Sequence, residues 1–244
     1  MENNFISKTK NFLKSFTPYQ ITYLVLVFTV TAIFTICMPE MMLDDMSNTF
    51  VVVCSVIAVL ANPICELLIS KQSRLNFIVD LFFIEIPEFV LCMALGWYSI
   101  AIVTMFFWVP IDIVSYLRWS KNLDEERDEL TVVKKMTVKQ DILVILGIVA
   151  FSLIAGSLIG LIPGAADSYL DALAAACGMA NGILLLLRYT EQWYAWFITL
   201  ILYTVLYIIS GSYIMLITTF AMLVNTCYGF VKWVLYTKKS KSLS

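Results

Sequence analysis

Histidine is absent from the 244-residue sequence, which excludes histidine proton relays and histidine metal ligands. The six cysteines lie singly within or at the ends of apolar runs, without a C-x-x-C pair, and are typical of small core residues. The P-loop motif G-x-x-x-x-G-K-[ST] is also missing. Because no nucleophile–base arrangement or cluster of metal ligands occurs, we predict no enzyme activity, cofactor or metal, and we expect no nucleic-acid partner.

Charged residues are scarce as well. They make up 14% of the chain, against 61% hydrophobic residues, and the mean hydropathy is +0.87. A soluble domain is about half apolar and about a quarter charged. Apolar stretches long enough to cross a bilayer as helices recur along most of the chain. The sequence therefore predicts an all-α, polytopic membrane bundle surrounded by lipid.

The distribution of basic residues predicts how the bundle is oriented. We expect eight spans, at residues 20–38, 49–70, 75–95, 98–119, 141–162, 168–188, 191–210 and 212–236. Every Lys and Arg lies in or next to the termini and the connections after spans two, four and six, and none lies in the other connections. By the positive-inside rule, both termini are predicted to be cytoplasmic and the number of spans to be even.

Two polar segments lie outside these spans. The loop 120–140 mixes acidic and basic residues and is predicted to be a solvated linker or a short surface helix. The N-terminus carries Lys8, Lys10 and Lys14 before a long apolar run without an evident cleavage site. We therefore expect an uncleaved cytoplasmic lead-in.

Two predicted span ends share a pattern. Span four ends 110-PIDIVSYLRWSK-121 and span eight ends 224-VNTCYGFVKWVL-235. Superposing Trp119 on Trp233 aligns a small, an aromatic and a basic residue before each Trp. The basic connections around Lys71 and Arg188 also correspond. We therefore predict two parallel copies of a three-helix unit, joined by one linker helix that lets both copies point the same way.

This repeat divides the chain into four parts. They are the N-terminus with a peripheral first span (1–48), the first repeat (49–119), the loop and linker helix (120–167), and the second repeat with a basic tail (168–244). The linker helix carries Gly156, Gly160 and Gly164 at intervals of four. Such a ridge of small residues lets another helix approach closely, so we interpret it as a packing face.

Five acidic residues lie inside apolar spans, where ionisable groups are costly and need a partner, water or a function. They are Glu66, Asp80, Glu85, Glu88 and Asp112, and no basic residue inside the membrane pairs with them. A cationic substrate, a coupling proton or a water-filled cavity would explain them. Proximity to the membrane interface is an alternative explanation, particularly for Glu66 and Glu88.

The stretch 188-RYTEQWYAWF-197 places Trp193 and Trp196 three residues apart, on one face at the start of span seven. An aromatic belt at the membrane interface predicts indoles at this position. The alternative is a substrate site, because facing indoles form a slot for a planar ring and attract a cationic one. The neighbouring Glu191 and Gln192 favour this alternative, as do further aromatic residues at Trp108, Tyr116 and Tyr228.

Together, 191-EQWYAW-196 with the preceding Arg188, 110-PIDIVSYLRW-119 and 225-NTCYGFVKW-233 resemble the PnuC-type nicotinamide riboside transporter family. The predicted order of three helices, one helix and three helices, with an additional N-terminal span, is similar too. The resemblance covers residues 49–238 and implies a full-length SWEET-like bundle in the cytoplasmic membrane, assembled as a homotrimer.

The resemblance also implies a function. It is uptake of nicotinamide riboside, or a closely related ribosyl or vitamin compound, by facilitated diffusion, with trapping by a cytoplasmic kinase that phosphorylates the substrate. Deoxynucleosides, thiamine and riboflavin are alternative substrates within the family. A proton-coupled symporter is a further alternative, in which Glu85, Glu88 or Asp112 serves as a coupling or pore acid. A scaffold that transports nothing is the alternative outside this class.

In the family the W-x-x-W lines the substrate site, and this role carries over to Trp193 and Trp196. We expect Asp112, Asn225 and Tyr228 to offer polar contacts at the midplane of an alternating-access carrier. The other expected members of the site are Tyr116, Gln192, Thr199 and Asn76. Leu200 and Asp112 stand where the family's nicotinamide riboside members usually carry Asn and Gln, so the carboxamide must be recognised differently or the substrate is another compound.

Overall fold

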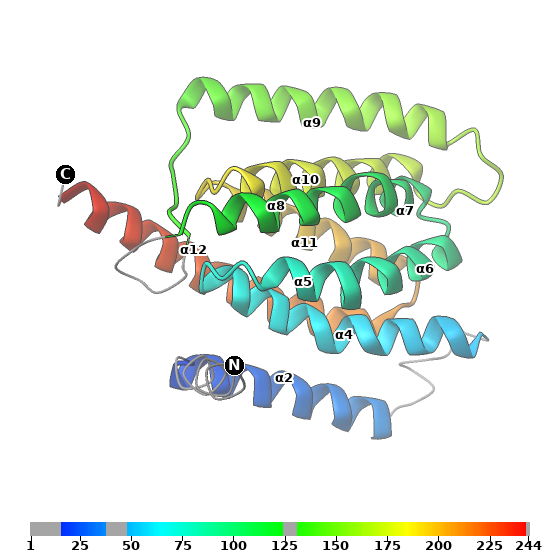
Figure 1. The fold of residues 1–244 in the computed structure, drawn as a ribbon. Coiled ribbons are helices and arrows are strands. Elements are labelled where there is room, and N and C mark those ends of the chain that lie inside the picture. The colour runs from blue at the N-terminus through cyan, green and yellow to red at the C-terminus, as the bar shows by residue number, and fades with distance from the viewer. Residues whose placement is uncertain (1–15, 38–47, 124–130, 243–244) are drawn as a thin grey trace.

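The computed structural model describes residues 16–37, 48–123 and 131–242, and within them the chain is a bundle of long helices (Figure 1). In chain order the elements are α2 (Pro18–Cys37), α4 (Thr49–Ser70), α5 (Asn76–Asp80), α6 (Ile86–Leu95), α7 (Tyr98–Val103), α8 (Val109–Ser120), α9 (Val138–Ile159), α10 (Ser168–Leu186), α11 (Gln192–Ile209) and α12 (Tyr213–Ser242). The π-helical turns η1 (Leu81–Glu85) and η2 (Thr104–Trp108) join α5 to α6 and α7 to α8. The N-terminal lysines and the acidic part of the loop 120–140 lie outside the described residues.

Local capping explains where two of these helices begin. Asn48 precedes α4, and its side-chain Oδ1 accepts a hydrogen bond from the Phe50 backbone N–H at 2.9 Å. Thr137 precedes α9 and forms a capping box with Gln140, whose Oε1 accepts from the Thr137 N–H at 2.9 Å. This capping box starts α9 at Val138 rather than at the predicted residue 141.

Seven helical segments of the described chain are long and apolar enough to cross a membrane. These segments are Pro18–Cys37, Thr49–Ser70, Tyr98–Ser120, Val138–Ile159, Ser168–Leu186, Gln192–Ile209 and Met215–Lys238. The predicted third span corresponds to α5, η1 and α6, which follow one another without a gap but carry Asp80, Glu85 and Glu88. The protein is therefore a polytopic helical membrane protein, and the count of eight spans stays a prediction.

The turn before α5 and the turn before α11 have the same backbone geometry. Gln72 and Arg188, which are 116 positions apart, both take left-handed φ values, of 62° and 65°. Arg188 is buried at this end of the bundle, and desolvation, together with the nearby Arg118, lowers the pKa of its guanidinium. The loop after α8 contacts both turns. The backbone N–H of Thr131 donates a hydrogen bond to the carbonyl of Gln72, and the backbone N–H of Lys134 donates one to the carbonyl of Arg188.

Two tryptophans tie the halves of the bundle together in a reciprocal way. Trp119, at the end of α8, donates its indole N–H to the carbonyl of Leu185 in α10 at 3.0 Å. Trp233, in α12, donates to the carbonyl of Ile69 in α4 at 3.2 Å. Both indoles are fully buried and contact each other, with ring centroids 6.1 Å apart. The two acceptors, Ile69 and Leu185, are 116 positions apart, as are Gln72 and Arg188.

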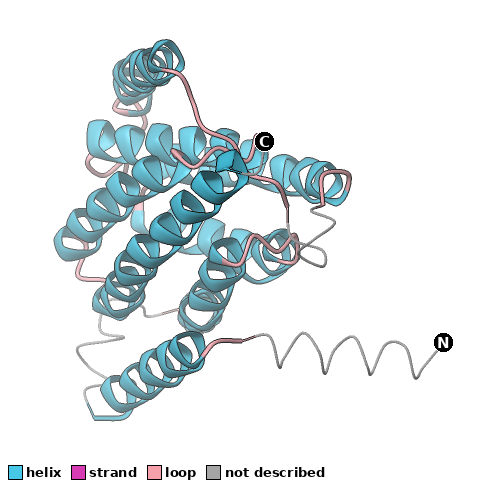
Figure 2. Ribbon diagram, turned by 90° about the vertical axis from the view of Figure 1, so that its left-hand side faces the viewer, coloured by secondary structure: helices cyan, strands magenta, loops and turns pink. Residues whose placement is uncertain are grey.

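Two helices flank this central group. In Figure 1, α9 lies on one side of the bundle and α2 on the other, and the turned view of Figure 2 shows the same separation. α2 packs against α12 and α4, whereas α9 packs mainly against α10. Gly156 serves this contact, since a Cβ there would lie 2.6 Å from the Tyr169 ring. The predicted ridge does not extend to Gly164, because α9 ends at Ile159 and Gly164 lies in the following turn with a left-handed φ of 85°.

Candidate functional site

A cavity lies inside the bundle where the π-helical first half meets α10 and α11. Its walls come from α4, the α5–η1–α6 segment, η2, α10 and α11. The lining residues are Asn62, Cys65, Glu66, Ile69, Asp80, Ile84, Glu85, Glu88, Trp108, Asn181, Leu185, Gln192, Trp196 and Tyr203. The space that water molecules can occupy measures about 40 Å³, enough for a few waters. A substrate ring would therefore enter only after the walls part.

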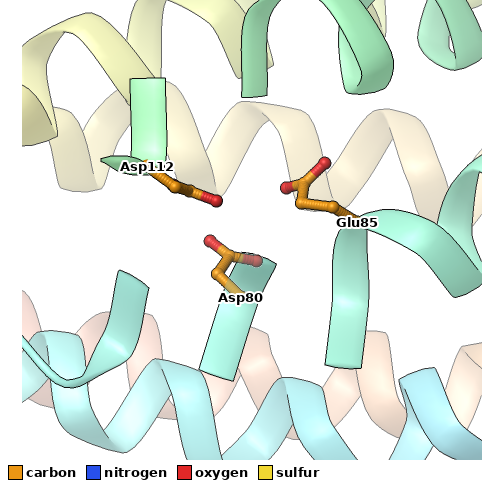
Figure 3. Close-up of side chains that lie close together, drawn as sticks. All are labelled: Asp80, Glu85 and Asp112. Carbon is orange, nitrogen blue, oxygen red and sulfur yellow. The ribbon is translucent and has the colours of Figure 1, made fainter. Parts of the chain in front are cut away.

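Three carboxyl groups meet at one wall of this cavity. Asp80, Glu85 and Asp112 each place one oxygen within 4.8 Å of the other two, and Figure 3 shows the three side chains pointing toward one another. Asp80 and Glu85 line the cavity, and Asp112 reaches them from α8. Glu85 Oε2 and Asp112 Oδ2 are buried without a hydrogen-bond partner among the described residues.

The two π-helical turns bring these groups together. η1 ends at Glu85 and η2 ends shortly before Asp112, and the two turns contact each other. Each is followed by a proline, Pro87 or Pro110, which has no backbone N–H to continue the usual hydrogen-bond pattern. A widened turn next to a proline is typical of functional sites in helices, because it redirects the side chains that follow.

Amide groups line the cavity as well. Asn181 Nδ2 donates to the backbone carbonyl of Gln192 at 3.1 Å and to its side-chain Oε1 at 2.7 Å. Because a backbone carbonyl only accepts, this pair fixes Nδ2 as the donor and therefore leaves Gln192 Nε2 on the other side of its amide. Gln192 is 1% exposed, and Nε2 has no partner among the described residues. A buried, unpaired hydrogen-bond donor thus belongs to a residue that lines the cavity.

A second acidic position is supported from α12. Glu66 lines the cavity from α4, and its Oε2 accepts a hydrogen bond from Asn225 Nδ2 at 3.2 Å. Its other oxygen, Oε1, has no partner among the described residues. The Trp196 indole also lines this part of the cavity, and its buried N–H lies near Glu66 without forming a hydrogen bond of good geometry.

Trp108 lines the cavity from η2 and lies against α10. Gly178 and Gly182 allow this approach, since a Cβ at Gly182 would lie 2.8 Å from the Trp108 ring. The cavity is therefore bounded by carboxyl groups, two indoles and an amide pair, contributed by α4, the α5–η1–α6 segment, η2, α10 and α11.

The structure separates the two tryptophans of the W-x-x-W. Trp196 lines the cavity, whereas Trp193 is fully buried in the core, edge-on to Trp233 with ring centroids 5.7 Å apart. Gly229 leaves room for Trp193, since a Cβ there would lie 2.4 Å from its ring. The two indoles therefore do not form one slot in this conformation.

The other predicted site residues fall into three groups. Those that line the cavity, besides Trp196, are Gln192, Glu85 and Glu88. Those that lie next to a lining carboxyl group without lining the cavity themselves are Asp112 and Asn225. Those that neither line the cavity nor lie next to a lining carboxyl group are Asn76, Tyr116, Thr199 and Tyr228.

The third group is packed in several ways. Tyr228 stacks on Tyr19 of α2 with ring centroids 4.0 Å apart. Thr199 bonds back to the Ala195 carbonyl at 2.9 Å, and Tyr116 lies under the Arg74 guanidinium. Asn76 is fully buried, with neither atom of its amide partnered in the described chain.

Several residues that line the cavity were not among the predicted site residues. Asn181 is the clearest example, although an amide inside the Ala-rich span 168–188 is itself a signal of a buried polar contact. Asn62, Trp108 and Tyr203 lie on helices whose facing could not be derived from the sequence. Glu66 and Asp80 stood out as intramembrane acids, but nothing in the sequence indicated that they face one cavity.

Known proteins with similar sequences belong to one family. A family model described as "Nicotinamide mononucleotide transporter" matches residues 52–235. The nicotinamide riboside transporter PnuC of Neisseria mucosa is 24% identical over 193 residues, which cover 75% of this chain and 72% of the relative. The PnuC of Haemophilus influenzae is 24% identical over 188 residues, covering 76% of this chain and 81% of the relative.

A solved structure has the same fold. The crystal structure of the vitamin B3 transporter PnuC superposes with a TM-score of 0.77 at 18% identity, covering 92% of this chain and 94% of that one. At this identity the likeness concerns the arrangement of the helices, and it leaves the side chains of the cavity to be interpreted from this chain itself.

Proposed function

This chain belongs to the nicotinamide mononucleotide transporter family and is of its PnuC type, and we propose that it carries nicotinamide riboside, or a closely related ribosyl or vitamin compound, across the cell membrane by facilitated diffusion. The observation that carries the proposal is the cavity inside the bundle, with two indoles for a planar ring and polar groups for ribose hydroxyls. Its narrowness fits a carrier caught with the substrate site closed.

The proposed transport cycle rests on two parallel three-helix units, α4 to α8 and α10 to α12, joined by α9. The matched turns at Gln72 and Arg188 and the reciprocal bonds of Trp119 and Trp233 support this duplication. The cavity lies between the units, so rocking one unit against the other would open it to each side in turn.

The proposed orientation places both termini in the cytoplasm. It is supported by the contacts of the loop after α8 with the turns at Gln72 and Arg188, which gather basic connections at one end of the bundle. At the other end, the N–H of Ala166 bonds to the carbonyl of Gly96, where the connections carry no basic residue. A cytoplasmic kinase would then trap the substrate, because facilitated diffusion alone only equalises concentrations.

The test uses purified protein in kinase-free liposomes. Uptake of labelled nicotinamide riboside, thiamine, riboflavin and deoxynucleosides is measured down a concentration gradient, with empty liposomes as the control. We expect saturable uptake of one compound that stops when the concentrations equalise. Failure of the active, folded protein to carry any of them would contradict the proposal.

The cluster of Asp80, Glu85 and Asp112 favours one second candidate, a proton-coupled symporter, because carboxyl groups inside a membrane are common proton carriers. The same liposomes distinguish the two. A uniporter keeps its uptake after an uncoupler collapses the proton gradient, whereas a symporter loses uptake against a gradient.

The homotrimer implied by the family is tested by the mass of the protein in detergent, measured by light scattering.

A further inference from the structure

We propose that the acidic wall of the cavity is a counter-charge for a substrate ring that carries a permanent positive charge, so that this carrier selects cationic aromatic compounds over neutral ones. This inference rests on the proposed transport function and narrows its substrate class. It separates the cationic pyridinium and thiazolium compounds from neutral nucleosides and flavins.

The first support is the excess of uncompensated acid. Four carboxyl side chains line the cavity, and Asp112 places an oxygen within 4.8 Å of those of Asp80 and Glu85. None of the described lining residues is a lysine or an arginine. Like charges packed this closely repel one another, and a bound positive charge removes that repulsion while it gains their attraction.

The second support is independent of the acids and indicates that the ligand is organic. Gln192 Nε2 is a buried donor without a partner among the described residues, held in place by Asn181 in a wall of the same cavity. A metal ion or a proton would compensate the carboxyl groups but gives this donor nothing to bond. A ligand that combines a positive charge with hydroxyl or carbonyl acceptors satisfies both walls.

The third support is the pair of indoles. Trp108 and Trp196 line the cavity together with the acids, from η2 and α11. An indole face attracts a cation through its quadrupole, and the attraction grows when water is excluded. The carboxyl groups and the indoles therefore favour the same charge on a planar ring.

The experiment compares ligands that differ in charge and little else. Binding to the full-length protein in detergent is measured by calorimetry for nicotinamide riboside and its uncharged dihydropyridine form, and for thiamine and its uncharged 3-deaza analogue. Deoxyadenosine and riboflavin complete the neutral set. We expect the cationic member of one pair to bind at least about tenfold more tightly than its neutral partner.

Substitutions assign this preference to the acidic wall. We expect Glu85→Gln and Asp80→Asn each to reduce the affinity for the cation by about tenfold or more, with a smaller change for the neutral partner. The control is Asp167→Asn, because Asp167 is an exposed carboxyl far along the chain from the cavity-lining acids and its left-handed backbone, with φ of 44°, suits asparagine. This control should leave both affinities unchanged.

Each contrary outcome has a distinct meaning. Equal affinities within both pairs, or binding of the neutral set alone, would overturn the charge selection while leaving a family transporter in place. Stabilisation by sodium or calcium that competes with the organic ligand would assign the acids to an inorganic ion and also overturn it. Absence of binding by every compound would reject the proposed function itself.

Discussion

The segment α5–η1–α6 and the helix α11 follow matching turns, yet they carry opposite chemistry. The first holds Asp80, Glu85 and Glu88 and is widened by a π-helical turn, whereas α11 is uninterrupted and has no charged residue. Asp80 and Trp196 stand at corresponding positions, 116 residues apart, and both line the cavity. Two helical segments that follow similar turns thus supply two different walls of one site.

The same contrast exists within the W-x-x-W. Trp193 and Trp196 begin the same helix, but the first is core and the second is cavity wall. Of these two indoles, Trp193 should therefore contribute more to the free energy of unfolding, and Trp196 more to ligand binding.

The largest effect on stability is expected from Trp193→Ala. Removing this fully buried indole leaves a cavity against Trp233 and Gly229, so the free energy of unfolding should fall by about 3–5 kcal/mol. Thermal unfolding in detergent measures the change. The matched variant is Trp196→Ala, which should unfold at a temperature much closer to that of the parent while losing ligand affinity. Equal destabilisation by the two variants would erase the distinction between them.

The next effect is expected from Asp171→Ala, which removes a contact between the halves. The Asp171 carboxyl group in α10 accepts the backbone N–H groups of Ser99 at 2.7 Å and Ile100 at 3.0 Å, at the start of α7. Leaving both buried donors unpaired should cost about 2–4 kcal/mol. Asp171→Asn keeps one acceptor and should cost less. If both variants unfold like the parent protein, this contact does not hold the halves together.

A smaller effect is expected from Gly229→Ala. The new methyl group would overlap the Trp193 ring, so we expect a loss of about 1–3 kcal/mol from forced repacking. Gly147→Ala is the control, because a Cβ at Gly147 in α9 meets nothing within 4 Å and alanine favours a helix by up to about 1 kcal/mol. Similar unfolding temperatures for both variants would show that Trp193 can move aside.

The smallest effects are expected from Trp119→Phe and Trp233→Phe. Each variant keeps an aromatic ring but loses one indole hydrogen bond, to Leu185 or to Ile69, at a cost of about 1 kcal/mol. The prediction concerns their equality, which follows from the reciprocal placement of the two bonds. Unfolding curves that differ strongly between the two variants would indicate that the two indole hydrogen bonds are not equivalent.

Much of the helical framework could be predicted from the sequence. The predicted range 49–70 coincides with α4, and 98–119 nearly coincides with the segment from α7 to α8, because apolar length and polar boundaries determine where a membrane helix begins and ends. The π-helical turns escaped prediction, since a local composition rich in apolar residues does not distinguish a widened turn from a regular one. These turns are nevertheless the elements that direct Glu85 and Asp112 toward each other.

The candidate site was accessible from the sequence only in part. Intramembrane acids such as Glu85 and the indole of Trp196 stand out by their cost or size, and both line the cavity. Asn181 and Tyr203 did not stand out in this way. Trp193 and Trp196 were predicted to lie on the same helical face, so the sequence did not distinguish their environments. Spacing places two residues on one helical face, but it does not say which neighbour that face meets.

By itself, the sequence determined the apolar helices, the segregation of basic connections and the presence of unpaired acids within the membrane, because each depends on transfer between water and lipid and is local to its segment. The convergence of Asp80, Glu85 and Asp112, and the position of Gln192 and Trp196 in one cavity lining, follow from tertiary packing. The burial of Trp193 in the core follows from tertiary packing as well. These outcomes depend on how helices distant in the sequence pack and on where glycines such as Gly182 and Gly229 let an indole approach.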